Sequence, residues 1–124
     1  MGRRSRRRRQ EGAQETAATS AYTADDGSVL TLRDQISAGT LKKLGELDAK
    51  PAADAEDRWQ RRVEFLFERL AVRWEIAGLP LEGQREVLGR YRMASSGERQ
   101  QVRKILGDHL AAKHLAAKHP EIDL

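Results

Sequence analysis

The sequence of 124 residues contains no cysteine, which excludes disulfide bonds, thiolate metal sites and cysteine nucleophiles. It also lacks any run of about 18 consecutive apolar residues, the length that a membrane-spanning helix needs. The positively charged opening stretch is not followed by an apolar segment, so we expect neither a secretory nor a twin-arginine signal. These absences predict a cytoplasmic protein without a membrane partner.

Net positive charge is absent outside the first residues. The chain has 23 Lys and Arg and 19 Asp and Glu side chains. Six of the arginines lie within residues 1–15 together with two glutamates, which leaves 17 side chains of each sign for residues 16–124. The body therefore carries no net charge, whereas a broad nucleic-acid footprint requires a positive surface.

Residues 1–20 contain no branched aliphatic or aromatic side chain, so burial cannot offset the entropy lost on ordering them. We expect a disordered leader. Its candidate nucleic-acid contacts are Arg3, Arg4, Arg6, Arg7, Arg8 and Arg9. Arginine binds phosphate through its forked donors and stacks on unpaired bases, but no aromatic residue alternates with these arginines, as single-strand binding usually requires. The leader is thus interpreted either as a nucleic-acid tether or as a solubilising segment.

The remaining pattern predicts a mainly α fold, with three to four helices and an N-terminal β-hairpin at about 21–33. Asp26-Gly27 is a strong hairpin turn signal, and the alternation after it places Leu30 and Leu32 inward, with Val29, Thr31 and Arg33 outward. We expect the folded domain to span residues 21–119 and a short tail to span residues 120–124.

Four segments have helical signals. A short helix around Leu41, Leu44 and Leu47 is capped by Ser37 or Thr40 and ends at Pro51. A long helix over 54–78 begins at the N-cap Asp54 and ends at Gly78 and Pro80. A third helix follows over 82–94, with Val87, Leu88 and Tyr91 inward. The fourth covers 95–119 with Ser95 and Glu98 as a capping box, and its buried side is Val102, Ile105, Leu106, His109 or Leu110, and Ala112.

The expected long helix has a main apolar stripe that suits a core: Trp59, Val63, Leu66, Phe67, Leu70, Trp74 and Ala77. A second, narrower patch combines Phe65, Val72 and Ile76. Arginines flank this patch at Arg62, Arg69 and Arg73. One interpretation buries the patch inside the domain. The other makes it a surface for a protein partner, because exposed apolar side chains with an arginine rim are typical of interfaces.

Catalytic and metal-binding patterns are weak. His109, His114 and His119 are five residues apart, a spacing that turns successive rings by about 140° and prevents them from sharing one ion. Glu64, Glu68 and Glu75 share a helix face but have no Glu-x-x-His companion, so a solvated face is favoured. Ser37 and Ser95 suit capping. We therefore expect no enzyme activity, no cofactor and no metal.

Two stretches resemble the siphophage tail assembly chaperones. They are "ADDGSVLTLRDQISAGTLKKLGELD", in which a strand pair precedes a helix, and "LFERLAVRWEIAGLPLEGQREVLGRYR", in which a helix meets a Gly-Leu-Pro break. The resemblance covers about residues 24–110 and does not include the arginine leader. It implies a non-enzymatic assembly protein that coats helical segments of a tape-measure protein and recruits tail-tube subunits. The alternative is a nucleic-acid-associated protein tethered by residues 3–9.

Overall fold

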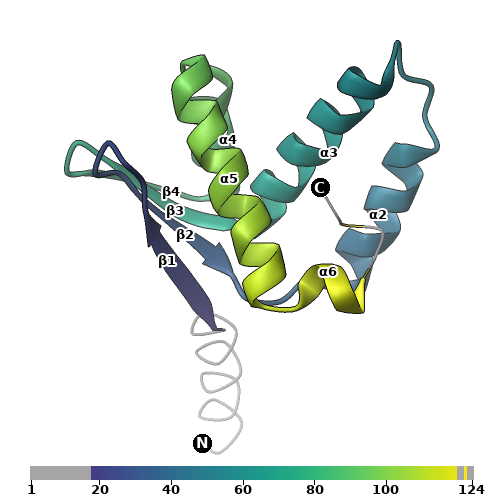
Figure 1. The fold of residues 1–124 in the computed structure, drawn as a ribbon, viewed down its shortest axis with the longest axis horizontal. Coiled ribbons are helices and arrows are strands. Elements are labelled where there is room, and N and C mark those ends of the chain that lie inside the picture. Colours follow the sequence, from purple (N-terminus) through teal and green to yellow (C-terminus); the bar gives the residue numbers. More distant parts are fainter. Residues whose placement is uncertain (1–17, 120–121, 123–124) are drawn as a thin grey trace, which may run out of the picture.

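The computed structural model describes residues 18–119 and residue 122 of the chain (Figure 1). In this part, four strands form one antiparallel sheet: β1 (Thr19–Thr23), β2 (Val29–Arg33), β3 (Ala71–Ile76) and β4 (Leu79–Glu82). The helices are α2 (Ala38–Asp48), α3 (Ala55–Leu70), α4 (Gln84–Arg92), α5 (Ser96–Ala112) and α6 (Leu115–Lys118). The fold is mixed α and β, so the expected mainly α class is wrong, whereas the helical character and the N-terminal hairpin are confirmed.

The strands lie in the sheet in chain order, although α2 and α3 separate β2 from β3 in the sequence. One row of paired side chains crosses the whole sheet, from Tyr22 through Leu30 and Trp74 to Leu81. Leu30 and Trp74 are buried, while Arg73, which is adjacent to Trp74, is exposed. The sheet therefore has one face in the core and one open face, as antiparallel sheets commonly do.

The expected helix over 54–78 ends at Leu70, and residues 71–76 are a strand instead. Pairing with β2 explains this, because the alternation of Trp74 and Ile76 on one face suits a half-buried strand as well as a helix. Leu32 pairs with Ala71 and Thr31 with Arg73, which leaves Val72 as the extra residue of a β-bulge.

The break that sequence reasoning assigned to a helix end is a hairpin turn. Ala77 and Gly78 both have positive φ, at 52° and 79°, and they lie between the paired residues Ile76 and Leu79. Two positive φ angles in a two-residue loop are characteristic of a type I′ turn, whose twist matches that of the flanking strands. Gly78 is thus a turn residue of the β3–β4 hairpin.

The local signals of the first hairpin are confirmed. Gly27 has a φ of 85°, and the Asp26 carboxylate accepts hydrogen bonds from the amide and the hydroxyl of Ser28, at 2.9 and 2.6 Å. Leu30 and Leu32 are buried as expected. The hairpin is therefore closed by an aspartate turn that stabilises the backbone on the far side of the glycine.

The expected helix caps are also confirmed at three positions. Ser37 caps α2, Asp54 caps α3, and Ser95 forms a capping box with Glu98 at the start of α5. Both alternatives for the buried side of α5 are realised, because His109 and Leu110 are buried. Ala112, in contrast, is exposed.

The expected fourth helix over 95–119 is broken. His114 has a φ of 57°, and the chain turns there into the short α6, which packs its Leu115 into the core. A left-handed residue cannot continue an α-helix, so the C-terminal segment folds back against the domain instead of extending from it.

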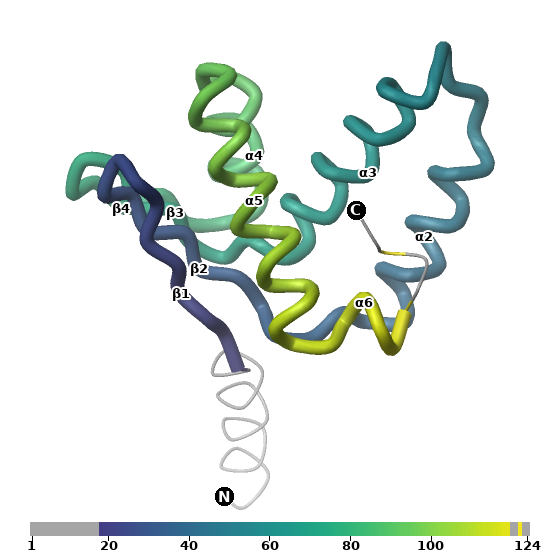
Figure 2. The backbone as a smooth tube through the Cα atoms, in the orientation of Figure 1, coloured from purple at the N-terminus to yellow at the C-terminus, as the bar shows by residue number. Residues whose placement is uncertain are grey.

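α2 and α3 contact each other as an antiparallel pair, and their connecting loop lies far from the sheet (Figure 2). The core joins the buried side of the sheet to α2, α3, α4 and α5 in one cluster that includes Leu44, Phe67 and Leu106. Among the described residues, no helix is long and apolar enough to cross a membrane.

Candidate functional site

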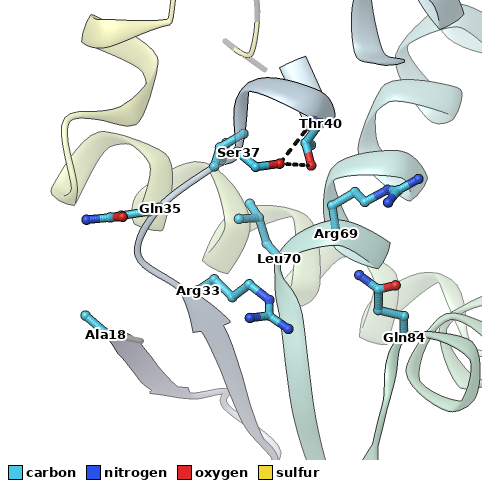
Figure 3. A pocket seen from close by; sticks show the side chains of 9 residues that line it. Ala18, Arg33, Gln35, Ser37, Thr40, Arg69, Leu70 and Gln84 are labelled. Carbon is cyan, nitrogen blue, oxygen red and sulfur yellow. Dashed lines mark hydrogen bonds between the residues drawn. The ribbon is translucent and has the colours of Figure 1, made fainter. Parts of the chain in front are cut away.

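An open cavity of about 630 Å³ lies where four elements begin or end. β2 contributes its last residue, Arg33, and α2 contributes its N-cap, Ser37. α3 contributes Arg69 and Leu70 from its last turn, and α4 contributes its first residue, Gln84. Figure 3 shows Ser37 and Thr40 on one side of Leu70 and Arg33 on the other. We call this the Arg33–Arg69 cavity.

The two arginines of the cavity have no carboxylate partner among the described residues. Arg33 is exposed and Arg69 is half-buried. The Nε of Arg69 is buried and, within the described part of the chain, has no hydrogen-bond partner. Its guanidinium carbon lies 5.3 Å from the centre of the Phe65 ring, a cation–π distance. The Arg69 head group is thus held by an aromatic ring and keeps its hydrogen-bond donors.

Three other arginines of the domain lie beside acids. Arg90 lies 2.7 Å from Glu98, Arg61 lies 3.1 Å from Asp57, and Arg92 lies 3.2 Å from Glu64. The Arg33–Arg69 cavity thus holds two guanidinium groups that no carboxylate of the described residues neutralises.

The N-terminus of α2 adds to this positive potential. The Ser37 hydroxyl accepts a hydrogen bond from the Thr40 amide at 3.1 Å, and no acidic residue lies in the first turn of the helix. The partial positive charge of a helix N-terminus is usually compensated by an acidic side chain there. Here the cavity faces a helix start without that compensation.

The backbone of Arg33 is held in place from behind by a buried histidine. His109 on α5 is fully buried, and its Nε2 lies 2.7 Å from the Arg33 carbonyl oxygen. Because a carbonyl can only accept, Nε2 carries a proton, and in the neutral imidazole Nδ1 then accepts from the Tyr22 hydroxyl at 2.6 Å. His109 is thus a positioning residue for the end of β2.

The residues expected to bind a protein partner do not form one helical patch. Phe65 lies on α3, whereas Val72 and Ile76 lie on β3. Phe65 and Ile76 are half-buried and pack against the core, and Val72 is the half-buried bulge residue. The structure does bring Phe65 into contact with Arg69. Their role in binding stays a prediction.

The flanking arginines separate in the same way. Arg69 lines the cavity, but Arg62 lies 3.6 Å from Asp48 of α2. Arg73 lies on the open face of the sheet, 3.8 Å from Glu75 and 3.7 Å from Glu82. Of the six residues expected at a partner surface, Arg69 is therefore the one that lines the cavity.

The leader arginines Arg3, Arg4, Arg6, Arg7, Arg8 and Arg9 lie outside the described residues. The first described residue, Ala18, lines the Arg33–Arg69 cavity. The described part of the chain therefore begins at this cavity.

Sequence reasoning missed Arg33, Ser37, Thr40 and Gln84 as site residues. It placed Arg33 outward and considered Ser37 and Thr40 as caps, which the structure confirms for Ser37. A usable signal was present, because an outward arginine and a helix cap lie four residues apart in "RDQIS". Gln84 and Arg69 approach them only through the fold.

No group of three or more His, Asp or Glu side chains in the described ranges could hold a metal ion. Glu64 and Glu75 have arginine partners instead. Comparison with protein-family models, with curated proteins and with solved structures found no match to this chain. The cavity is therefore interpreted from its own geometry.

Proposed function

We propose that this protein is a non-enzymatic accessory protein that binds another protein at the Arg33–Arg69 cavity. The observation that carries this proposal is the pair of arginines without a carboxylate partner in the described part, set around the buried side chain of Leu70. Arginine is enriched at protein interfaces because its planar head group stacks and donates several hydrogen bonds at once. A partner that covers the cavity supplies the acceptors that Arg69 lacks among the described residues.

The arrangement suits binding better than catalysis. A catalytic site needs a nucleophile or an acid–base group within hydrogen-bond reach of a partner group that activates it. The hydroxyls of Ser37 and Thr40 lie 2.9 Å apart and serve the α2 cap. Their surroundings in the cavity are arginine, glutamine and aliphatic side chains, which orient a bound group without activating a nucleophile.

The resemblance to siphophage tail assembly chaperones supports the same class of function. We extend it to this chain as a proposal, in which the protein coats helical segments of a tape-measure protein and recruits tail-tube subunits during assembly. The Arg33–Arg69 cavity, and not the apolar patch of a long helix, is the surface we assign to this contact.

Site-specific photocrosslinking tests the proposal. A benzophenone side chain at position 84 sits at the edge of the cavity, and one at the exposed position 58 of α3 serves as the matched control. We expect position 84 to crosslink one defined protein in the native host, with and without nuclease treatment, and position 58 not to do so. Loss of the product after nuclease treatment, or equal products from both positions, would contradict the proposal.

A second candidate function is nucleic-acid binding through the leader. The position of Ala18 at the cavity favours it, because Arg9 is nine residues upstream and can lie at most about 30 Å from Ala18. The leader arginines and the two cavity arginines would then contact the same nucleic-acid chain at two separate places. Each phosphate contact would steepen the salt dependence by about 0.9 in log–log slope on duplex DNA.

Replacing the six leader arginines by glutamine in the full chain separates the two candidates. We expect this variant to lose affinity for single-stranded RNA and DNA while it keeps the crosslinked protein. If nucleic-acid affinity survives with an unchanged salt slope, the described domain itself binds the phosphates and protein binding is not the main function of the cavity.

A further inference from the structure

We infer that the Arg33–Arg69 cavity takes an acidic segment of the partner protein, in which an Asp or Glu side chain is next to an apolar one. This inference rests on the proposed function and names the chemistry of its partner. Three features of the cavity carry it, namely its charge, its apolar floor and the charge of its surroundings.

The charge of the cavity selects an anion. Arg33 and Arg69 both line it, and neither has a carboxylate partner among the described residues. Arginine and carboxylate form paired, charge-assisted hydrogen bonds that are stronger than neutral ones. The α2 N-terminus at Ser37 lies on the same cavity and adds a partial positive charge to which a carboxylate is complementary.

The apolar lining of the cavity favours a ligand that has an apolar side chain next to its acidic one. The half-buried Ile36 lines the cavity, together with Leu70, which is only 1% exposed. A free inorganic anion would leave the exposed part of Ile36 in water, whereas a Leu or Met side chain of a peptide would cover it. A cavity of about 630 Å³ falls within the usual range for ligand sites, about 300 to 1,000 Å³.

The surroundings of the cavity favour a peptide over a nucleic acid. A nucleic-acid interface is extended and strongly positive, but residues 16–124 carry 17 basic and 17 acidic side chains. The neighbouring open face of the sheet presents Glu75 and Glu82 around Arg73. A phosphate backbone that continued from the cavity along this face would meet carboxylates, whereas one acidic side chain would not extend that far.

An NMR titration of the ¹⁵N-labelled full chain tests the inference. The probe is the peptide acetyl-EELEE-amide, and its matched control is acetyl-QQLQQ-amide. We expect the acidic peptide to shift the amides of residues 37–40 and the Arg69 Nε–H, and the neutral peptide to leave them unchanged. The Arg33→Gln, Arg69→Gln double variant should bind the acidic peptide at least tenfold more weakly.

Arg58→Gln is the control variant, because it makes the same change at an exposed position eleven residues before Arg69 on α3, about 16 Å away along the helix. It should bind the peptide like the unmodified protein. The amide spectra of all variants show whether each variant is folded. If the double variant has lost its native spectrum, the single variant Arg33→Gln replaces it, because Arg33 is exposed. We expect this single variant to bind the acidic peptide at least threefold more weakly.

Three outcomes would overturn the inference. They are equal shifts from the neutral peptide, unchanged affinity in the arginine variants, and tighter binding of a single-stranded oligothymidylate of ten nucleotides at the same amides. If the double variant binds the protein that crosslinks to position 84 as tightly as the unmodified chain does, the proposed function stands and this inference fails. If the acidic peptide binds as expected but no protein crosslinks, the preference of the cavity for an acidic peptide stands, whereas the proposed function, and with it the assignment of that peptide to a partner protein, fails.

Discussion

The imidazole Nε2 of His109 donates a hydrogen bond of 2.7 Å to the backbone carbonyl of Arg33. This contact joins the middle of the fold to the rim of the Arg33–Arg69 cavity, because Arg33 is the last residue of β2 and His109 is buried on α5. Tyr22 completes the arrangement with a hydroxyl 2.6 Å from Nδ1 and a ring edge-on to the imidazole.

Replacing His109 by asparagine should destabilise the protein by about 2–4 kcal/mol, because a shorter side chain cannot reach both partners and leaves buried space. Urea unfolding measures this free energy. Combination with Tyr22→Phe should give a coupling energy of about 0.5–3 kcal/mol, as expected for directly bonded groups. The control is His114→Asn at an exposed position with positive φ, which asparagine tolerates. Equal losses from His109→Asn and His114→Asn would contradict the positioning role.

Ala77 has an unfavourable backbone conformation in the β3–β4 turn. Its φ of 52° is a left-handed conformation, which costs a residue with a Cβ about 1–2 kcal/mol. Ala77→Asn creates the Asn-Gly pair that type I′ turns prefer, so we expect unfolding free energy to rise by about 0.5–1 kcal/mol. Ala77→Val should lower it, since a β-branched residue suits positive φ least. A destabilising Ala77→Asn would show that the loop is not a type I′ turn.

Tyr91 carries a buried hydroxyl that has no hydrogen-bond partner within the described residues. Burial raises the pKa of this phenol, since the charged form would lose its hydration. Removing an unsatisfied polar atom while keeping the ring avoids a desolvation cost, so Tyr91→Phe should leave stability unchanged or raise it by up to about 1 kcal/mol. Thermal unfolding checks this. A loss above about 1 kcal/mol would mean that the hydroxyl is engaged after all.

Acid should weaken the domain through two hydrogen-bonded carboxylates. The Ser28 hydroxyl lowers the pKa of Asp26, and the Ser95 amide lowers the pKa of Glu98, with further help from Arg90. Because both folded-state pKa values lie below the unfolded ones, their stabilisation is present at neutral pH. It is lost as the pH falls from the ordinary carboxyl range, about 4, through the folded-state values.

The variant Glu98→Gln isolates one of these groups, because glutamine keeps the capping box without titrating. The difference in unfolding free energy between pH 6 and pH 3 should be smaller in Glu98→Gln than in the unmodified protein. Glu46→Gln at an exposed helix position is the control and should leave the difference unchanged. An identical pH dependence in all three proteins would exclude this role for Glu98.

The parts of the fold that depend on a few neighbouring residues could be predicted from the sequence. Asp26-Gly27 set the first hairpin turn, and Ser37, Asp54 and Ser95 set helix starts. In each case the side chain that decides the structure is within four residues of the backbone that it stabilises. This is why these boundaries are correct.

The strand β3 could not be predicted in the same way. Trp74 and Ile76 continue the apolar spacing of α3, so the local pattern permits a helix, and pairing with the distant β2 decides the outcome. The cavity also depends on the pairing of β2 with β3. This pairing brings Arg33 and Arg69 to the same cavity, and in the sequence neither residue differs from an ordinary surface arginine.

The loop that connects α2 to α3 has a practical consequence. The loop over 49–54 is far from the sheet (Figure 2). It joins the ends of α2 and α3 opposite to those that line the cavity, and its residues Lys50, Pro51 and Ala53 are exposed. Surface loop tips of this kind accept insertions with little thermodynamic penalty. A fluorophore or an affinity handle attached there would report on docking at the opposite end of the molecule while leaving the docking residues untouched.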